Sequence, residues 1–530
     1  MRNKKLQVWL PLLFSLVMIS GMFFGFKLQQ ETGSTKGFFK KDKRSALQEA
    51  LDLIRTRYVD AVIVDSLQDN AMVEMMNHLD PHSIYIPASD LTEANEDIVG
   101  NFQGIGVEFN IFSDTVHILY VVPDGPGDKA GLKIGDRILQ VNDSSIVSKT
   151  LPSQSIKRMI RGESGSKVKL TILRGATIQF FYVTRGTIPI PSLDAHYMMD
   201  SITGYIKLNK FSEKTYKEFM RAMENLSNRG MKNLVFDLRG NGGGLIREAV
   251  HIADEFLDGE KLIVYTEGSN TPKRQYKASK EGVFETGKLV VLIDELSASA
   301  SEIVAGALQD WDRATVVGRR SFGKGLVQEQ YSLTDGSAIR LTVARYFTPA
   351  GRSIQRPYDK GKKIYMDDLL QRYRNGELIS PDSVHLDKEL TYKTKGGRTV
   401  YGGGGIMPDV FVPLDTTSYT QNITRLYLDG RFNNFVYQYF IQNAKEWEKY
   451  KNPTDFAARY RNTEDAWNQL VQFAQKDSIQ LVKVPEKDKK EVQDRIKAFL
   501  ARFQWRTQGF YEVANTSDDI VQKALEVIYQ

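Results

Sequence analysis

The sequence predicts an α/β protein, in which a layered core of strands and helices is joined to a small β-barrel module and flanked by helical regions. Three continuous apolar runs, residues 234–238, 289–294 and 315–318, alternate with helical segments, as expected for strands that are covered on both faces. Between residues 100 and 183 the apolar period is two, which is typical of half-buried strands. Apolar residues make up 41% of the chain and charged residues 26%, values that fit a globular chain rather than a disordered or fibrous one.

The composition narrows the chemistry that this protein can use. Its 530 residues contain no cysteine, which excludes disulfides, thiolate metal sites and cysteine nucleophiles. Six histidines leave little room for a histidine metal site. Lys and Arg total 71 and Asp and Glu 65, and the net charge of +6 does not indicate a nucleic-acid-binding protein. Any catalysis must therefore come from Ser, Thr, Lys, Tyr or carboxylates.

The amino terminus, residues 1–27, predicts a signal anchor. Arg2, Lys4 and Lys5 precede residues 6–26, which carry no charge and as a helix span roughly 30 Å, the thickness of a bilayer core. The basic flank lies before this segment, so the positive-inside rule places the remaining chain outside the cytoplasm, in the periplasm. A cleaved signal peptide is the rival interpretation, but no small-x-small cleavage site follows the segment.

Residues 28–44 are interpreted as a linker, because they combine glycine, serine and a run of charges. Residues 45–95 form a predicted helical region, with apolar residues such as Leu47, Leu51 and Ile54 at helical spacing. Asp80 precedes Pro81, and the residue before proline avoids helical geometry, so a helix is expected to end there.

Residues 96–186 contain strand-like segments punctuated by glycine and aspartate turns, and they resemble a PDZ domain of the bacterial protease type. The resemblance implies a loop, Gly104, Ile105, Gly106 and Val107, whose N–H groups bind a peptide carboxylate. It also implies that the adjacent strand edge accepts the peptide by β-augmentation. The alternative is a small β-barrel in which these glycines only form a turn.

Residues 187–415 form the predicted α/β core, with a polar insertion at about 356–400. Residues 416–530 are mostly helical and charged, and Trp447, Trp467 and Trp505 are expected to anchor their packing.

A serine-rich turn follows the apolar run 289–294. Small residues at a strand-to-helix turn let a serine hydroxyl stand exposed, and the amides that follow point towards any anion held there. Ser299 and Glu302 also match a capping box, so a helix cap explains the serine equally well.

A nucleophilic serine needs a base, and no histidine lies between His251 and His385. A lysine can serve if it is neutral; deprotonation near pH 7.5 takes roughly 4 kcal/mol in water, a deficit that burial can remove. Lys324 is the best placed, among glycines and apolar residues, although a solvated surface charge is the simpler explanation of a single lysine. Residues 318–324 also satisfy G-x-x-x-x-G-K, but Gly325 stands where a phosphate-binding loop needs Ser or Thr.

Taken together, the motifs resemble the carboxyl-terminal processing peptidases, also called tail-specific proteases. The match runs from about residue 45 to 415, and its ordered motifs lie at residues 79–83, 237–244, 297–303, 323–328, 348–355 and 405–409. The resemblance implies a PDZ-containing serine endopeptidase with a crotonase-like core and a Ser–Lys dyad, without a metal or cofactor. The resemblance further implies that such an enzyme cleaves exported proteins near or from their unstructured carboxyl-terminal ends.

Site residues follow from the same resemblance. The nucleophile falls on Ser299 and the base on Lys324, and Gln328 matches the glutamine that orients the lysine. If residues 324–328 form a strand, Lys324 and Gln328 share a face. The backbone N–H groups of Gly243 and Ala300 are expected to bind the oxyanion, although glycine at 242, where many relatives have proline, leaves the choice among 242–244 open.

Two functions from different classes remain. One is a membrane-anchored protease that acts on protein tails, and the other is a catalytically silent PDZ scaffold that binds such tails in the periplasm. Retention of both Ser299 and Lys324 favours the enzyme. The expected partners are protein or peptide substrates with free carboxyl termini and the membrane, but no nucleic acid. The sequence leaves open whether the chain forms a homo-oligomer, and whether residues 416–530 serve oligomerisation, adaptor binding or a lid.

Overall fold

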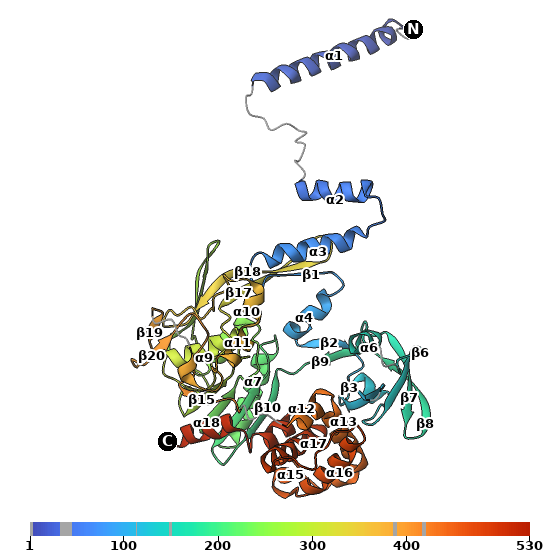
Figure 1. Ribbon diagram of the computed structural model, residues 1–530. Coiled ribbons are helices and arrows are strands. Elements are labelled where there is room, and N and C mark those ends of the chain that lie inside the picture. The colour runs from blue at the N-terminus through green and yellow to red at the C-terminus, as the bar shows by residue number, and fades with distance from the viewer. Residues whose placement is uncertain (1–3, 32–44, 113, 148–150, 385–388, 416–419) are drawn as a thin grey trace. The chain divides into compact units, whose positions relative to one another are not determined.

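The computed structural model describes residues 4–31, 45–112, 114–147, 151–384, 389–415 and 420–530 (Figure 1). The chain divides into two compact units, residues 1–72 and 73–530. Each unit is described by itself.

The first unit is helical. It contains α1 (Lys4–Glu31), α2 (Ala46–Arg57) and the beginning of α3 (Val64–Asn77). Helix α1 covers the predicted apolar segment and exposes large side chains, among them Trp9 and Phe14. Among the described residues, no helix combines the length and apolarity that crossing a membrane demands. The predicted linker lies largely outside the described residues, and its residues 28–31 continue α1.

The second unit begins with the end of α3, strand β1 (Ile84–Ile86) and helix α4 (Leu91–Val99). A six-stranded antiparallel sheet follows, in the order β3-β4-β5-β7-β8 with β6 beside β5. Its elements are β3 (Val107–Phe112), β4 (Thr115–Val121), α5 (Pro126–Lys129), β5 (Arg137–Val141), β6 (Ser144–Ser145), α6 (Ser153–Ile160), β7 (Lys167–Arg174) and β8 (Thr177–Thr184).

This sheet is open: no strand pairing among the described residues closes it into the β-barrel that the sequence predicted. Among the described residues, strand β3 pairs only with β4, so no described strand lies on its outer edge. The residues just before it form β2 (Asn101–Gly104), which pairs with β9 (Gly186–Pro189) as a separate ribbon instead of extending the sheet. The backbone that would be needed to close a barrel is therefore used elsewhere.

The α/β core is built on a second six-stranded sheet, in the order β10-β11-β12-β15-β16-β21. All its strand pairs are parallel except β10 with β11. The strands are β10 (Leu193–Met198), β11 (Thr203–Leu208), β12 (Asn233–Asp237), β15 (Leu289–Ile293), β16 (Thr315–Gly318) and β21 (Val410–Phe411). The three predicted apolar runs are thus neighbouring strands.

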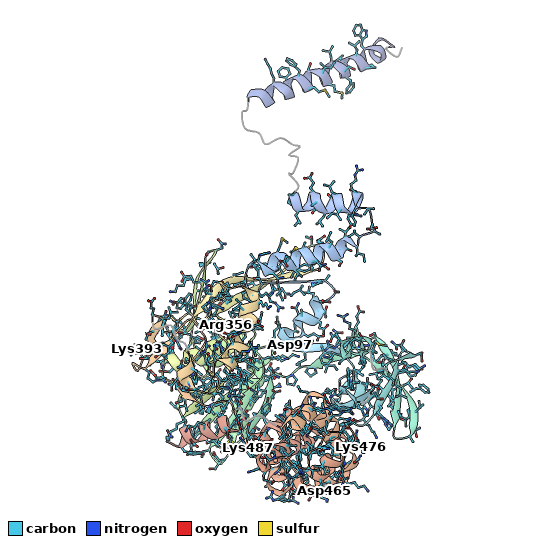
Figure 2. The ribbon with its side chains drawn as sticks, in the orientation of Figure 1. Asp97, Arg356, Lys393, Asp465, Lys476 and Lys487 are labelled. Carbon is cyan, nitrogen blue, oxygen red and sulfur yellow. The ribbon has the colours of Figure 1, made fainter. Side chains whose placement is uncertain are left out.

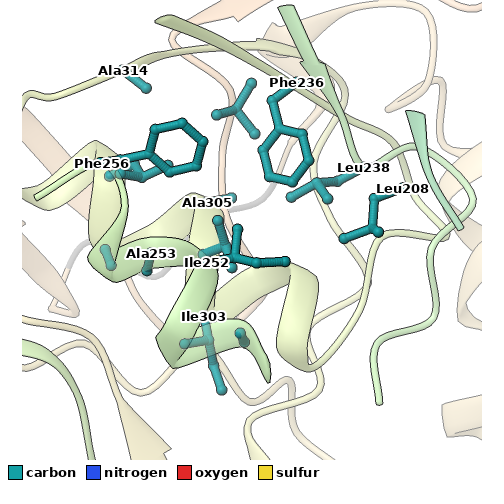
Figure 3. Close-up of a cluster of buried hydrophobic side chains, with 14 of the residues drawn as sticks. Leu208, Phe236, Leu238, Ile252, Ala253, Phe256, Ile303, Ala305 and Ala314 are labelled. Carbon is teal, nitrogen blue, oxygen red and sulfur yellow. The ribbon is translucent and has the colours of Figure 1, made fainter. Parts of the chain in front are cut away.

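Both faces of this sheet are covered. Helices α7 (Thr215–Asn228), α8 (Ile246–Asp254) and α9 (Ala300–Asp310) pack on one face, around side chains such as Phe236 and Ile303 (Figure 3). The other face receives α18 (Asp519–Tyr529), whose Ile520, Val521 and Ile528 contact the alternate residues of the strands. The second layer therefore comes from the far end of the chain.

A further sheet of the second unit has five antiparallel strands. It consists of β1, β13 (Leu262–Gly268), β14 (Thr271–Lys277), β17 (Leu326–Ser332) and β18 (Ala338–Phe347). The loop that follows β16 leads into one of them, β17. The predicted polar insertion contains α10 (Lys362–Met366), α11 (Asp368–Arg374), the 3-10 turn η1 (Pro381–Ser383), β19 (Thr391–Lys393) and β20 (Thr399–Tyr401).

The C-terminal helices enclose an aromatic core of their own. They are α12 (Gln421–Leu428), α13 (Arg431–Gln442), α14 (Ala444–Trp447), α15 (Pro453–Arg459), α16 (Thr463–Gln475) and α17 (Glu486–Ala514). Trp447 and Trp467 are buried in this core and Trp505 packs against it, which confirms their predicted role as anchors. Asp465 and Lys476 mark two surface positions of this region (Figure 2).

Helix α17 and the turn after it connect the C-terminal helices with two other parts of the second unit. Arg502 and Arg506 form ion pairs of 2.6 and 2.7 Å with Glu108 on β3. At the start of α18, Asp518 accepts two hydrogen bonds of 2.9 Å from Arg239, which lies in the loop after β12. The C-terminal helices thus contact both the outermost strand of the PDZ-like sheet and the core.

Candidate active site

Ser299 occupies a strained turn at the carboxyl end of β15, directly before α9. Its φ of 55° and ψ of −112° are unusual for a residue with a side chain, and such strain is found mostly where the surrounding structure imposes it for function. The turn is held by buried contacts, because Ala298 N–H and Ser301 Oγ both donate to the Asn241 carbonyl oxygen, at 3.0 and 2.9 Å. Ser299 itself is half-buried.

Lys324 lies in the glycine loop between β16 and β17, and two side chains hold its backbone to that of Ser299. Glu302 Oε2 accepts the N–H of Ser299 at 2.8 Å and that of Lys324 at 2.9 Å. The Tyr346 hydroxyl lies 3.0 Å from the Ser299 carbonyl oxygen and 2.6 Å from that of Lys324. Both residues are therefore anchored to the same two side chains, Glu302 on α9 and Tyr346 on β18.

The Glu302 carboxylate is fully buried and is satisfied by four donors. Besides the two backbone amides above, Ser321 Oγ and Gly323 N–H donate to Oε1 at 2.5 and 2.7 Å. Burial raises the pKa of Glu302, and the four hydrogen bonds oppose that shift. The predicted capping pair of Ser299 and Glu302 does more than cap α9, since the same carboxylate fixes the lysine loop.

The environment of Lys324 favours its neutral form. Burial lowers the pKa of the amine, and the positive charge of Arg340 lowers it further, while Glu302 and Asp80 act in the opposite direction. The Nζ donates to Gln328 Oε1 at 2.9 Å. The shared face was predicted on the condition that residues 324–328 form a strand; β17 begins at Leu326, after Lys324, and its register shifts between Val327 and Gln328. A direct hydrogen bond, rather than strand periodicity, brings the two side chains together.

The glycine loop after β12 lies against the serine. A methyl group placed on Gly243 would lie 2.7 Å from Ser299 Cβ and 2.9 Å from Ala300 N, so the Gly243 backbone touches the turn. Ala300 N–H donates to no acceptor among the described residues. The N–H of Gly243 is occupied, because it donates to Asn241 Oδ1 at 2.9 Å. The structure thus places both predicted oxyanion residues beside Ser299, but only Ala300 has a free N–H.

His82 is a site neighbour that the sequence reasoning missed. Its carbonyl oxygen accepts a hydrogen bond from Gln328 Nε2, and its ring Nε2 is hydrogen-bonded to the Tyr365 hydroxyl at 2.8 Å. Burial, and next the charge of Lys324, lower the pKa of His82 to about 4, so the ring is neutral at neutral pH. The search for a histidine near the serine in the sequence could not find it, because only the tertiary fold brings residues 79–83 to the site.

The predicted peptide loop lines a groove beside α6. Gly104, Ile105, Gly106 and Val107 all border a cavity of about 330 Å³ between the free edge of β3 and helix α6. The carbonyls of Ile105 and Gly106 are held by Gly127 and Val122, at 2.7 and 2.8 Å. The N–H groups of Ile105 and Gly106 donate to no acceptor among the described residues, which leaves two donors side by side.

Comparison with known proteins places the chain in a family. Residues 202–361 match peptidase family S41, and residues 117–174 match the PDZ domain. The chain is 34% identical over 369 residues to the carboxy-terminal processing protease CtpA of Bacillus subtilis, covering 69% of this chain and 75% of that protein. A carboxy-terminal-processing protease of Bartonella bacilliformis is 32% identical over 373 residues, covering 69% and 83%.

The chain belongs to the carboxy-terminal processing proteases of peptidase family S41.

As an S41 carboxy-terminal processing protease, the protein is an enzyme of the serine protease class, and its predicted α/β fold with a PDZ domain is confirmed. Among solved structures, the photosystem II D1 C-terminal processing protease is similar at 25% identity and a TM-score of 0.38, covering 70% of this chain and 87% of that one. Residues 422–506 match a family of unknown function.

Some residues of the S41 protease site were missed by the sequence reasoning, and they differ in how clearly the sequence indicates them. Glu302 was visible as half of a capping box, and His82 lies in a motif of the family resemblance, but nothing in the sequence points to Tyr346 or Arg340. In the described part of the chain, no group of three or more histidine or acidic side chains is arranged to hold a metal ion.

Proposed function

We propose that this protease cleaves protein substrates by acyl transfer, with Ser299 as the nucleophile and Lys324 as the general base. The observation that carries the proposal is the shared anchoring of the two residues by Glu302 and Tyr346, combined with the burial that favours a neutral Lys324 amine. A lysine held in this way can accept a proton near neutral pH, as a serine nucleophile requires.

The reaction proceeds in two halves. Neutral Lys324 accepts the hydroxyl proton of Ser299, and Ser299 Oγ forms a bond to the scissile carbonyl carbon. Collapse of the tetrahedral intermediate breaks the C–N bond, and the Lys324 ammonium returns its proton to the leaving amine. Water then attacks the acyl-enzyme, with Lys324 again as the base, and releases the new carboxyl terminus and Ser299.

The oxyanion needs donors that are aimed at the developing charge. Ala300 N–H is free and lies at the amino terminus of α9, where backbone amides favour an anion. Gly243 N–H is the second donor in this proposal, and it becomes available when the Asn241 side chain releases it. A substrate oxyanion, as a charged acceptor, competes well with the neutral amide oxygen of Asn241.

We also propose that the PDZ groove binds the free carboxyl terminus of the substrate. Supporting this are the two unoccupied N–H groups of Ile105 and Gly106 and the unpaired edge of β3, which can take an added strand. Because the carboxylate is the recognised group, an amidated tail should raise KM about tenfold or more. Equal KM values for free and amidated tails would remove the groove from the proposal.

The test of the catalytic proposal uses the full chain and an unfolded substrate. Ser299→Ala and Lys324→Ala should each abolish cleavage and labelling by a serine-directed fluorophosphonate, while circular dichroism stays that of the wild type. Lys129→Ala, on the small helix α5, is the matched lysine control and should cleave normally. Full activity of either dyad variant contradicts the assignment.

The cellular location of the protease is also proposed here, as extracytoplasmic and membrane-attached. The uncharged residues 6–26, the basic residues before them and the exposed apolar side chains of α1 support an extracytoplasmic protease attached to the inner membrane. Cell fractionation and the mass of the mature protein test it, because a cleaved signal peptide would give a soluble, shorter protein.

A further inference from the structure

The turn at residues 80–83 is a buried element to which the proposed chemistry assigns no role. Asp80 accepts the N–H groups of His82 and Ser83, at 2.8 and 2.9 Å, and the hydroxyl of Thr342, at 3.0 Å. Ser83 Oγ donates to the same carboxylate and accepts the N–H of Thr342 at 3.1 Å. Four donors thus hold one aspartate, and they fasten the turn to β18, beside the strand that carries Gln328.

This turn presents one carbonyl to the active site. The His82 carbonyl oxygen accepts a hydrogen bond from Gln328 Nε2, and the Oε1 of the same amide accepts from Lys324 Nζ at 2.9 Å. A carbonyl oxygen can only accept, so the NH2 group of Gln328 must face His82 and its oxygen must face the lysine. The orientation of the amide is therefore dictated by the turn.

The orientation matters for the lysine lone pair. A neutral amine has two N–H donors and a single lone pair, and that lone pair must take the serine proton. With Oε1 facing it, the amine is held through one of its N–H groups and the lone pair stays free. With the amide reversed, Gln328 would donate to the lone pair and block it.

We propose that the turn Asp80–Ser83 is a positioning element of the catalytic lysine: it holds the His82 carbonyl so that Gln328 presents its oxygen, and not its NH2 group, to Lys324. The inference rests on the proposed role of Lys324 as the base. It assigns a task to Asp80, a residue that does not touch the reacting atoms.

The insertion helices support the turn from the other side. The Tyr365 hydroxyl on α10 is hydrogen-bonded to the His82 ring, and the two rings meet edge to face at 5.2 Å. Arg356 stacks on Tyr365, with its guanidinium carbon 3.9 Å from the ring centre. The turn is thus clamped between β18 and the insertion.

The charges around this arrangement determine how its loss would appear in a pH profile. Three charged groups face Lys324: the negative Asp80 and Glu302 and the positive Arg340. His82 is faced by the positive Arg356 and Lys362. Removal of Asp80 takes away a charge that stabilises the ammonium, and a reversed Gln328 amide stabilises the neutral amine. Both changes lower the pKa of Lys324, whereas a loosened, hydrated site would raise it.

The test compares Asp80→Ala with Asp335→Ala in the full chain. Asp335 holds the same kind of turn, accepting the N–H and hydroxyl of Ser337 at 2.9 and 2.6 Å, but at the far end of the β17–β18 hairpin. We expect Asp80→Ala to lower kcat about tenfold or more with KM within about twofold, and to move the acidic limb of kcat/KM to lower pH. Asp335→Ala should leave both unchanged.

Two further variants keep the result interpretable. Asp80→Asn retains an oxygen for the His82 and Ser83 amides and should recover most of kcat while keeping the shifted limb. Ser83→Ala removes one of the donors to Asp80 and should change kcat and the acidic limb in the same direction as Asp80→Ala, but less. It can therefore replace Asp80→Ala in the test if that variant does not fold.

A double-mutant cycle with Gln328→Ala decides the route of the effect. If Asp80 acts through Gln328, adding Asp80→Ala to Gln328→Ala lowers kcat no further. The inference is overturned if the double variant shows the product of the two single losses in kcat. It is also overturned if Asp80→Ala keeps a wild-type kcat or moves the acidic limb of kcat/KM to higher pH. Full activity of Lys324→Ala would instead overturn the proposed function on which it rests.

Discussion

Alanine at Gly243 is the sharpest test of the glycine loop, because its neighbour provides a control. The added methyl group at Gly243 would lie 2.7 Å from both the Ala298 carbonyl oxygen and Ser299 Cβ, and φ is +97°. At Gly242 the same group meets nothing within 4 Å. Each variant therefore adds one methyl group to the chain, but only Gly243→Ala brings that group against Ser299.

The magnitude follows from these distances. Ordinary carbon contacts lie at about 3.5–4.0 Å, so the Ser299 turn or the loop must move by about 0.8 Å or more. A displacement of about 1 Å in a catalytic arrangement lowers the rate roughly 10²-fold. The left-handed backbone adds about 1–2 kcal/mol of strain for alanine. We expect kcat/KM of Gly243→Ala to fall at least about 10²-fold, and that of Gly242→Ala to stay within about twofold.

The assay measures kcat/KM on an unfolded, tail-tagged substrate, together with the rate of fluorophosphonate labelling at Ser299. Circular dichroism at the assay temperature verifies that both variants are folded. Near-equal rates for Gly243→Ala and wild type, or a loss in Gly242→Ala as large as in Gly243→Ala, would refute the placement of Gly243 against Ser299.

Three other predictions concern charge. Gln328→Glu places a carboxylate beside Lys324, which stabilises the ammonium, so the acidic limb of kcat/KM should move up by roughly one pH unit or more; an unmoved limb contradicts the contact. Despite its burial, Glu108 has a pKa lowered by the two arginines of α17, so the stability from this contact is present above the ordinary glutamate pKa and is lost as pH falls through the lowered one. The protection factors of the β3 amides, which compare the observed with the intrinsic exchange rate at each pH, should therefore fall in acid for the wild type, and Glu108→Gln should show the lower protection already at neutral pH. Asp518→Ala removes both the N-cap of α18 and the partner of Arg239, and should destabilise the protein by about 1–3 kcal/mol in denaturant titration. Asp519→Ala, at an exposed position, should change the stability little, and equal effects of the two variants would contradict the role of the Arg239–Asp518 pair.

The elements that sequence reasoning predicted well are those with a local signature. Three apolar runs became the parallel strands β12, β15 and β16, since a strand covered on both faces must be apolar at every position. Ser299 and Gly243 follow two of these strands, and neighbouring parallel strands bring their carboxyl ends together. The adjacency of the serine turn and the glycine loop was therefore inherent in the order of the motifs.

Other features had no local signature. The sequence predicted a barrel where the structure has an open sheet, because the pairing of β2 with the distant strand β9 cannot be inferred from the apolar period of either segment. Residues 416–530 were predicted only as a helical region, yet α18 covers the second face of the core sheet. An amphipathic helix shows that it has an apolar face but not which surface that face will cover.

The sequence by itself determined the class of chemistry: without cysteine and with few histidines, a hydroxyl, an amine and backbone amides were the groups left, and the ordered motifs pointed to Ser299 and Lys324. Only the tertiary structure decided how the site is held together. Glu302 and Tyr346 bind both residues, the turn at Asp80 orients Gln328, and burial lowers the pKa of the lysine. The contacts of Glu302 with Lys324 and of Tyr346 with both residues join separate elements, and the contact of Gln328 with His82 spans 246 positions. Burial is a property of the folded chain, so neither these contacts nor the lowered pKa can be derived from the order of residues alone.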